Sequence, residues 1–156
     1  MSYTIAKIDR PPQPVLVIRR SVPQSGIGAA IAEVLPRVFQ FMGAHGIAPA
    51  GAPVCRYVDM GPEPMTIEPG VPIAAAVTAG DPEIQCATLP GDALAYTLHA
   101  GPYDRLGEAH AALQDWMAAE GLEPAGGPWE SYINDPGEHP DPKDWKTEVF
   151  WPVRPK

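Results

Sequence analysis

Two short segments near the C-terminal end of the chain combine carboxylates with aromatic rings at the spacing of β-strands. Alternate residues of a strand face opposite sides, so Glu130 and Tyr132 share a face, and Glu148 and Phe150 share a face in the next segment. If these strands pair as a hairpin across residues 135–144, one surface would carry all four side chains. Such a surface suits an organic cation, because each ring face adds about 0.5–2 kcal/mol of cation–π attraction to the Coulomb term.

Other residues in the chain have weaker chemical patterns. His99 and Tyr103 flank Gly101-Pro102 and would line the same site, although a partly exposed histidine at a strand end is the simpler interpretation. The simpler interpretation of Glu130 and Tyr132 is likewise a solvated hairpin face, and Tyr132 and Phe150 are equally well explained as packing residues. The four histidines and two cysteines lack metal-ligand spacing, so no metal is predicted. No phosphate loop, dinucleotide fingerprint or G-x-S-x-G elbow occurs, so no cofactor and no α/β-type hydrolase is predicted.

The elements that must position these residues follow from an internal repeat. Residues 46–53 and 121–128 read almost identically at an offset of 75 positions, and the same offset matches Val38 with Leu113, Phe41 with Trp116 and Tyr57 with Tyr132. A single repeat of this length indicates a duplicated supersecondary unit. The offset also places Cys55 at the position of Glu130, where a small buried cysteine is a more ordinary role than a ligand contact.

Hydrophobic periodicity predicts the same order of elements in each half, about 1–78 and 83–153, within one domain of residues 1–156. The expected strands are 4–8, 15–22, 54–58 and 71–78 in the first half, and 84–89, 92–100, 129–134 and 146–153 in the second. Helices are expected at about 26–45 and after Gly101-Pro102. Pro36 should kink or split the first helix, because a proline ring displaces the preceding turn.

Composition limits the partners of the chain. Its 156 residues carry a net charge of −8, which opposes binding to nucleic-acid phosphates. The N-terminal residues lack a signal-peptide pattern, and no stretch was expected to approach the roughly 20 apolar residues of a membrane helix. Two isolated cysteines suit a reducing compartment, so the sequence predicts a cytoplasmic protein that binds neither membrane nor DNA.

The C-terminal third resembles the GyrI-like family, which includes effector-binding domains of AraC-type and MerR-type multidrug-responsive regulators. The resemblance rests on Gly-Pro-Tyr at 101–103, Pro-Trp-Glu-Ser-Tyr at 128–132 and Trp-Lys-Thr-Glu-Val-Phe-Trp-Pro-Val at 145–153. Residues 67–73 are similar to the element that closes the family's first half. The resemblance implies an α+β fold of tandem β-α-β-β modules with pseudo-twofold symmetry, an antiparallel sheet, two main helices and a central ligand groove. It also implies a ligand-facing glutamate at position 130.

Three function classes remain open at this stage. The first is a protein that binds amphipathic cations or aromatic compounds as a sensor or sequestering agent, without a helix-turn-helix segment of its own. The second, implied by some GyrI-like proteins, is a hydrolase of strained cyclopropane-bearing toxins, with Glu130 as general base and Tyr132 or Tyr103 as proton donor. The third is a protein-interaction module like the family's gyrase-inhibitory members. A binding protein is favoured over an enzyme.

The acidic composition generates a direct test with duplex DNA. At about 150 mM salt, micromolar protein should leave a labelled duplex unshifted in a gel, because a net charge of −8 repels the phosphate backbone. A retarded band that weakens as salt is added would show phosphate contacts and contradict this expectation.

Overall fold

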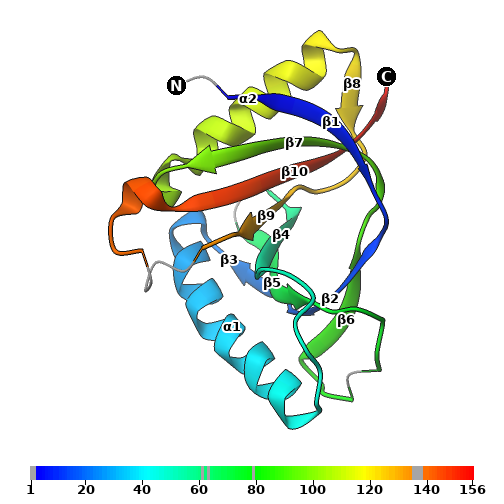
Figure 1. Cartoon of the computed structure of the whole chain (residues 1–156), viewed down its shortest axis with the longest axis vertical. Coiled ribbons are helices and arrows are strands. Elements are labelled where there is room, and N and C mark those ends of the chain that lie inside the picture. Colours follow the sequence, from blue (N-terminus) through cyan, green and yellow to red (C-terminus); the bar gives the residue numbers. More distant parts are fainter. Residues whose placement is uncertain (1–2, 61, 63, 79, 135–138) are drawn as a thin grey trace. The chain divides into compact units, whose positions relative to one another are not determined.

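The computed structural model describes residues 3–60, 62, 64–78, 80–134 and 139–156, and its contacts separate two compact units (Figure 1). One unit, here called the N-terminal unit, is Pro12–Pro90. The other, here called the C-terminal unit, combines Met1–Pro11 with Gly91–Lys156. Each unit contains one long helix and an antiparallel sheet, so the predicted α+β class is confirmed.

The N-terminal unit is a sheet with the strand order β6-β2-β5-β4, in which β3 also pairs with β5. Its elements are β2 (Gln13–Ile18), β3 (Arg20–Val22), the 3-10 turn η1 (Gln24–Gly26), α1 (Ile27–Ala44), β4 (Val54–Asp59), β5 (Met65–Pro72) and β6 (Ile84–Leu89). The strand expected at 71–78 is therefore wrong, since β5 begins and ends earlier. The strand expected at 15–22 is interrupted at Arg19.

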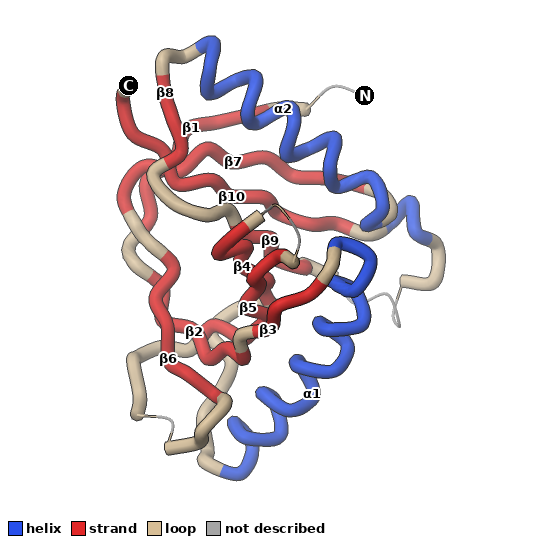
Figure 2. Tube along the Cα trace, turned by 180° about the vertical axis from the view of Figure 1, so that it is seen from behind, coloured by secondary structure: helices blue, strands red, loops and turns tan. Residues whose placement is uncertain are grey.

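The C-terminal unit has the strand order β1-β7-β10-β9, and β8 pairs with β10 (Figure 2). Its elements are β1 (Ile5–Arg10), β7 (Asp92–Ala100), η2 (Tyr103–Arg105), α2 (Leu106–Ala119), β8 (Leu122–Pro124), β9 (Trp129–Tyr132), η3 (Pro142–Asp144) and β10 (Lys146–Pro155). Helix α2 lies along β7 and β10 of this sheet.

The first strand of each half pairs with a strand of the other half. β1 pairs along its full length with β7, and β6 pairs along its full length with β2, so each unit receives one edge strand from the other half of the sequence. Only Pro11 and Pro12 separate β1 from β2, and only Pro90 and Gly91 separate β6 from β7. Two-residue hairpins need positive φ at the first loop residue, and proline is fixed near −65°. The chain therefore passes on to a different sheet at both places.

Residues that the 75-residue offset matches have similar burial in the two helices. Val38 and Leu113 are both fully buried, and Met42 and Met117 are nearly so. Phe41 and Trp116 are both partly buried at the edge of their unit's core. The two cores thus use equivalent helix positions. The buried core of the N-terminal unit consists of Leu16, Ile18, Val34, Val38, Met42, Val71, Ile73 and Ile84. The buried core of the C-terminal unit consists of Ala95, Leu106, Ala109, Leu113, Met117, Leu122, Val149, Trp151 and Val153.

Pro36 lies inside α1 without splitting it. Its ring is on the exposed side of the helix, so the backbone carbonyl that loses its helical hydrogen bond can be hydrated. The expected split is therefore wrong, and a kink at this residue stays a prediction.

One segment of the N-terminal unit is long and apolar enough to meet the composition of a membrane span. Residues Gln24–Ala44 reach a mean hydropathy of 1.2, contrary to the expectation that no stretch approaches such a span. In the fold, Ala30, Val34, Val38 and Met42 form one buried stripe, while Arg37 on the same helix forms an ion pair with Glu83 at 2.9 Å. This division of faces is typical of an amphipathic helix that covers a sheet.

Gly70 is the point of closest approach between β5 and β2. A Cβ atom added there would lie 2.1 Å from the backbone oxygen of Leu16 and 2.6 Å from Cγ1 of Val17. Backbone cannot move aside as a flexible side chain can, so only glycine fits. Gly70 lies within the segment 67–73 noted in the sequence. Its lack of a side chain lets β5 lie between β2 and β4.

Gly70→Ala should therefore destabilise the protein by about 3 kcal/mol or more, the size typical of severe overpacking. Urea denaturation followed by circular dichroism measures this. Gly43→Ala is the matched control, because its Cβ would meet nothing within 4 Å and a helix-interior alanine should add about 0.5–1 kcal/mol. Equal stabilities for the two variants would contradict the close approach.

Candidate functional site

The register between β9 and β10 decides which side chains surround Glu130. Glu130 lies opposite Val149, and Ser131 lies opposite Glu148. Directly paired residues of an antiparallel ladder share a face, so Glu130 lies on the face that carries Val149 and not on the face of Glu148. Val149 belongs to the core beneath α2, which puts Glu130 on the helix-covered side of the sheet.

This register corrects the predicted four-residue surface. Glu130 and Tyr132 share a face as expected, but Glu148 and Phe150 lie on the opposite face with Trp129. The prediction assumed that pairing of the two strands would put Glu130 and Glu148 on the same face. Glu130 instead pairs with Val149, so the pair Glu130 and Tyr132 and the pair Glu148 and Phe150 lie on opposite faces.

Glu130 is buried, with 3% of its surface exposed, and both of its carboxylate oxygens accept hydrogen bonds within the C-terminal unit. The Tyr132 hydroxyl donates to Oε1 at 2.9 Å. Nε2 of His110, on α2, lies 2.8 Å from Oε2. Buried carboxylates need such partners, because an isolated one would lose several kcal/mol of solvation.

His110 in turn contacts β10. The indole N–H of Trp151 donates to Nδ1 of His110 at 3.0 Å, and the two rings meet edge to face at 5.9 Å. Trp151 is 5% exposed and belongs to the core of this unit. The Glu130 carboxylate is thus connected by hydrogen bonds, through the His110 imidazole, to Trp151 of the hydrophobic core.

Aromatic rings extend this arrangement beyond the carboxylate. Tyr103, in η2, meets Tyr132 edge to face at 5.5 Å between ring centroids. Trp145, immediately before β10, lies 4.7 Å from Tyr103 in a tilted arrangement. We call Glu130, Tyr132, Tyr103 and Trp145 the β9 site. A carboxylate next to several ring faces is the arrangement that attracts an organic cation.

His99 is fully buried, not partly exposed at a strand end. Nδ1 lies 2.9 Å from the Tyr3 hydroxyl and Nε2 lies 3.0 Å from the Pro102 carbonyl oxygen. Both ring nitrogens are therefore used within the C-terminal unit. The contact with Pro102 fixes the turn that leads into Tyr103, so His99 stabilises the position of Tyr103 in the β9 site.

The face of β7 that carries His99 is the face covered by α2. The small and polar residues Ala95, Thr97 and His99 are fully buried under α2, while the large Leu98 on the other face is 42% exposed. Small residues are needed on the helix-covered face because α2 lies close to β7.

Glu148 and Phe150 form a separate cluster on the opposite face. Glu148 accepts a hydrogen bond from the Tyr96 hydroxyl at 2.7 Å. Phe150 stacks on Trp129 at 5.4 Å, and the Arg10 guanidinium lies 4.7 Å from the Phe150 ring centroid. Burial first, and then the hydrogen bond and charge of Glu148, raise the pKa of Tyr96 to about 12.

The N-terminal unit does not repeat the β9 site. The equivalent of Glu130 is Cys55, which is buried as expected, and the equivalent of His110 is Leu35. The buried glutamate of this unit is Glu68, on β5, whose carboxylate pairs with the Arg19 guanidinium at 2.9 Å. The duplication therefore preserved the framework and not the polar cluster.

Sequence reasoning missed His110, Trp151 and Trp145. The signal that could have indicated His110 is the repeat, because a histidine replaces the leucine of the first helix at the matching position. Among the residues that the structure describes, no group of three or more His, Cys, Asp or Glu side chains is arranged to hold a metal ion.

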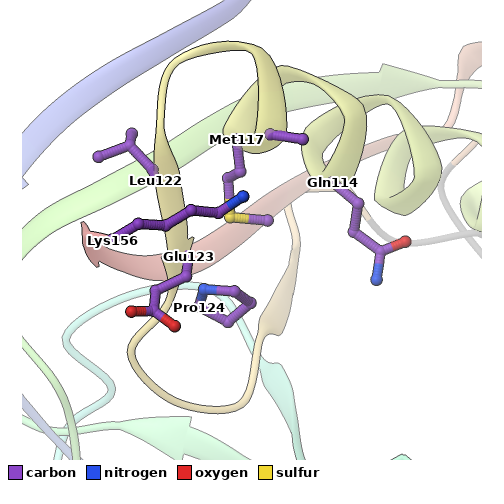
Figure 3. A pocket seen from close by; sticks show the side chains of 7 residues that line it. Gln114, Met117, Leu122, Glu123, Pro124 and Lys156 are labelled. Carbon is purple, nitrogen blue, oxygen red and sulfur yellow. The ribbon is translucent and has the colours of Figure 1, made fainter.

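A shallow pocket opens at the C-terminal end of α2 (Figure 3). It is lined by Gln114, Met117, Ala118, Leu122, Glu123, Pro124 and Lys156, with a volume of about 260 Å³. None of the predicted site residues lines it, and its mouth carries one acidic and one basic side chain. It offers no convergent polar groups of the kind that orient a ligand.

Comparisons with known proteins agree with the fold. The profile of the GyrI-like small molecule binding domain matches residues 3–154. The crystal structure of the EcmrR C-terminal domain is 26% identical with a TM-score of 0.87, and the match covers 100% of both chains. EcmrR in a complex with DNA is 24% identical with a TM-score of 0.87, but this match covers 99% of the present chain and only 58% of that one.

Two more distant structures show the same fold. SAV2435 bound to tetraphenylphosphonium is 11% identical, with a TM-score of 0.60 over 99% of this chain and 94% of that one. A hydrolase from Listeria innocua is 15% identical, with a TM-score of 0.63 over 97% of this chain and 92% of that one. A search of curated proteins gives no significant match.

The Tyr96–Glu148 contact yields a pH prediction for the face opposite the β9 site. The ultraviolet titration difference between wild type and Tyr96→Phe should show a midpoint near pH 12, and Glu148→Gln should lower it, because the negative charge of the acceptor is lost. The pKa of Tyr96 is higher in the folded protein than in the unfolded chain. Its neutral hydroxyl therefore contributes stability that is fully present below pH 10 and is lost as the pH rises through about 12. An ordinary midpoint in wild type would contradict this contact.

Proposed function

Because the chain belongs to the GyrI-like family of small-molecule-binding domains, we propose that it binds amphipathic cationic or aromatic compounds at the β9 site. The observation that carries the proposal is a buried carboxylate, Glu130, held by His110 and Tyr132 next to the rings of Tyr103 and Trp145. Glu148 and Phe150, on the opposite face, are left out of this site. His99 is included as a residue that supports Tyr103.

The electrostatics of the two buried glutamates support this choice of site. Glu68 pairs with Arg19, so its charge is balanced by a guanidinium. Glu130 instead accepts hydrogen bonds from a tyrosine hydroxyl and an imidazole. A carboxylate held in place by hydrogen bonds beside aromatic rings adds a Coulomb term to the cation–π attraction of an organic cation. The tetraphenylphosphonium bound to SAV2435 is a ligand of this class on the same fold.

We propose that binding serves sensing or sequestration in the cytoplasm. The chain corresponds in length to the C-terminal domain of EcmrR, and EcmrR has been solved in a complex with DNA. A regulatory role of the present chain would pass through a protein partner, because its net charge of −8 opposes direct DNA binding.

A hydrolase is the second candidate, favoured by the contacts of the same carboxylate. Glu130 would act as general base on water, and Tyr132, which already donates to it at 2.9 Å, or Tyr103 would act as proton donor. Product formation from a cyclopropane-bearing electrophile, absent in Glu130→Gln, separates this candidate from simple binding.

Glu130→Gln should weaken binding of tetraphenylphosphonium about 10-fold to more than 100-fold, because a charge-assisted contact contributes about 1.5–3 kcal/mol. The variant keeps the shape of the side chain and removes its charge. Neutral triphenylphosphine oxide should bind both proteins with similar affinity. Isothermal titration of each protein with each compound measures the difference.

Glu148→Gln is the matched control, since it makes the same change on the opposite face of the same sheet. Its affinity for tetraphenylphosphonium should stay within about threefold of wild type. If Glu148→Gln has the larger effect, the ligand sits on the other face. If neither variant matters, Glu130 is a structural residue.

A further inference from the structure

A continuous series of hydrogen bonds joins the core of the C-terminal unit to the β9 site. It runs from the Trp151 indole to Nδ1 of His110 at 3.0 Å, and from Nε2 of His110 to Oε2 of Glu130 at 2.8 Å. The Tyr132 hydroxyl completes it on Oε1 at 2.9 Å. All of these side chains are buried or partly buried.

The donor types in this series determine the state of the imidazole. An indole nitrogen can only donate, so Nδ1 of His110 must accept and carries no hydrogen. A neutral imidazole has one N–H, which is then on Nε2 and points to Glu130. A protonated imidazole has hydrogen on both nitrogens, and a hydrogen on Nδ1 would meet the indole N–H of Trp151 head on. Trp151 and a charged His110 are therefore incompatible in this arrangement.

We propose that Trp151 holds His110 in the neutral Nε2–H form, so that His110 orients Glu130 without adding a positive charge beside it. His110 and Trp151 are thus positioning residues for cation binding, and this role rests on the proposed function of the β9 site. A histidine beside a carboxylate would otherwise tend to gain a proton and to repel a cationic ligand. The indole removes that competition.

The groups around His110 are compatible with this role. From β9, Glu130 and Tyr132 face the imidazole side of the sheet, and from β7 the nearest titratable group on this face is His99, whose nitrogens are bonded to Tyr3 and Pro102. The other titratable or charged groups on the surrounding elements are Glu108 and Asp115 on α2, Glu120 directly after it, Tyr103, Asp104 and Arg105 on η2, Glu123 on β8, Asp92 and Tyr96 on β7, and Lys146, Glu148 and Arg154 on β10. Arg105 pairs with Glu108 at 2.6 Å, and Arg154 with Glu123 at 3.5 Å.

The first measurement uses the wild-type protein without ligand. Nitrogen-15 shifts of labelled histidine distinguish a protonated ring nitrogen from an unprotonated one. At neutral pH, Nε2 of His110 should carry hydrogen and Nδ1 should carry none, as the hydrogen bonds to Glu130 and from Trp151 require. Hydrogen on Nδ1, or on both nitrogens at neutral pH, would overturn the proposal. This test stands even if the variants below fail to fold.

The second measurement removes the indole donor with Trp151→Phe. As the pH falls from about 8 to about 5.5, the affinity of this variant for tetraphenylphosphonium should fall about tenfold, because the indole donor to Nδ1 of His110 is lost. The affinity of wild type should change by less than about threefold over the same range. Trp116→Phe, a tryptophan at the edge of the same core, is the matched control and should behave like wild type.

A double variant separates the charge of His110 from its shape. Glutamine at 110 can donate to Glu130 but never gains a proton, so Trp151→Phe with His110→Gln should bind the cation with no pH dependence over this range. A double variant that keeps the pH dependence of Trp151→Phe would show that another group causes it and would overturn the proposal.

The outcomes for the two proposals are distinguishable. If tetraphenylphosphonium binds none of the proteins, the proposed function fails, and the nitrogen-15 spectra still decide whether Trp151 controls His110. If it binds and Trp151→Phe shows no more pH dependence than wild type, the β9 site stands and the role of Trp151 is refuted.

Discussion

The antiparallel register between β9 and β10 is the constraint on which the β9 site depends. It places Glu130 opposite Val149 and so beneath α2, where a carboxylate is tolerated only with good hydrogen-bond partners. A shift of one residue would bring Glu130 and Tyr132 together to the face of Phe150 and separate Glu130 from His110. His110 on α2 and Trp151 on β10 can form their series of hydrogen bonds with Glu130 only in this register.

The two units show two ways of burying a glutamate in one framework. In the N-terminal unit, the charge of Glu68 is balanced by a guanidinium whose own side chain is 55% exposed. In the C-terminal unit, the Tyr132 hydroxyl on β9 and the His110 imidazole on α2 hold Glu130. The first carboxylate thus pairs with a guanidinium, and the second forms hydrogen bonds with a hydroxyl and an imidazole. The duplicated chain has thus kept one unit as framework and given the other its polar chemistry.

Much of the framework could be predicted from the sequence, because local patterns determine it. The repeat correctly paired Val38 with Leu113, since helix stripes follow a local period, and the alternation in β9 correctly put Glu130 and Tyr132 on one face. The pairing of strands was harder to predict. The prediction that Glu130 and Glu148 share a face depended on the register of the hairpin, which strand alternation alone does not determine. The exchange of β1 and β6 follows from Pro11 and Pro90, which do not fit the first position of a two-residue hairpin loop. His110 was missed because its role arises only from a contact between α2 and two strands.

The exchange of edge strands also has a consequence for the order in which the protein can form. The N-terminal unit is one continuous segment, Pro12–Pro90, whereas the C-terminal unit needs β1 from the very start of the chain and β7 from beyond residue 90. During synthesis β1 must therefore wait, without its partner, until β7 has left the ribosome. Such a strand invites association with other nascent chains. The sequence of β1 suits this interval, because Lys7, Asp9 and Arg10 interrupt its apolar residues and make it a poor template for aggregation.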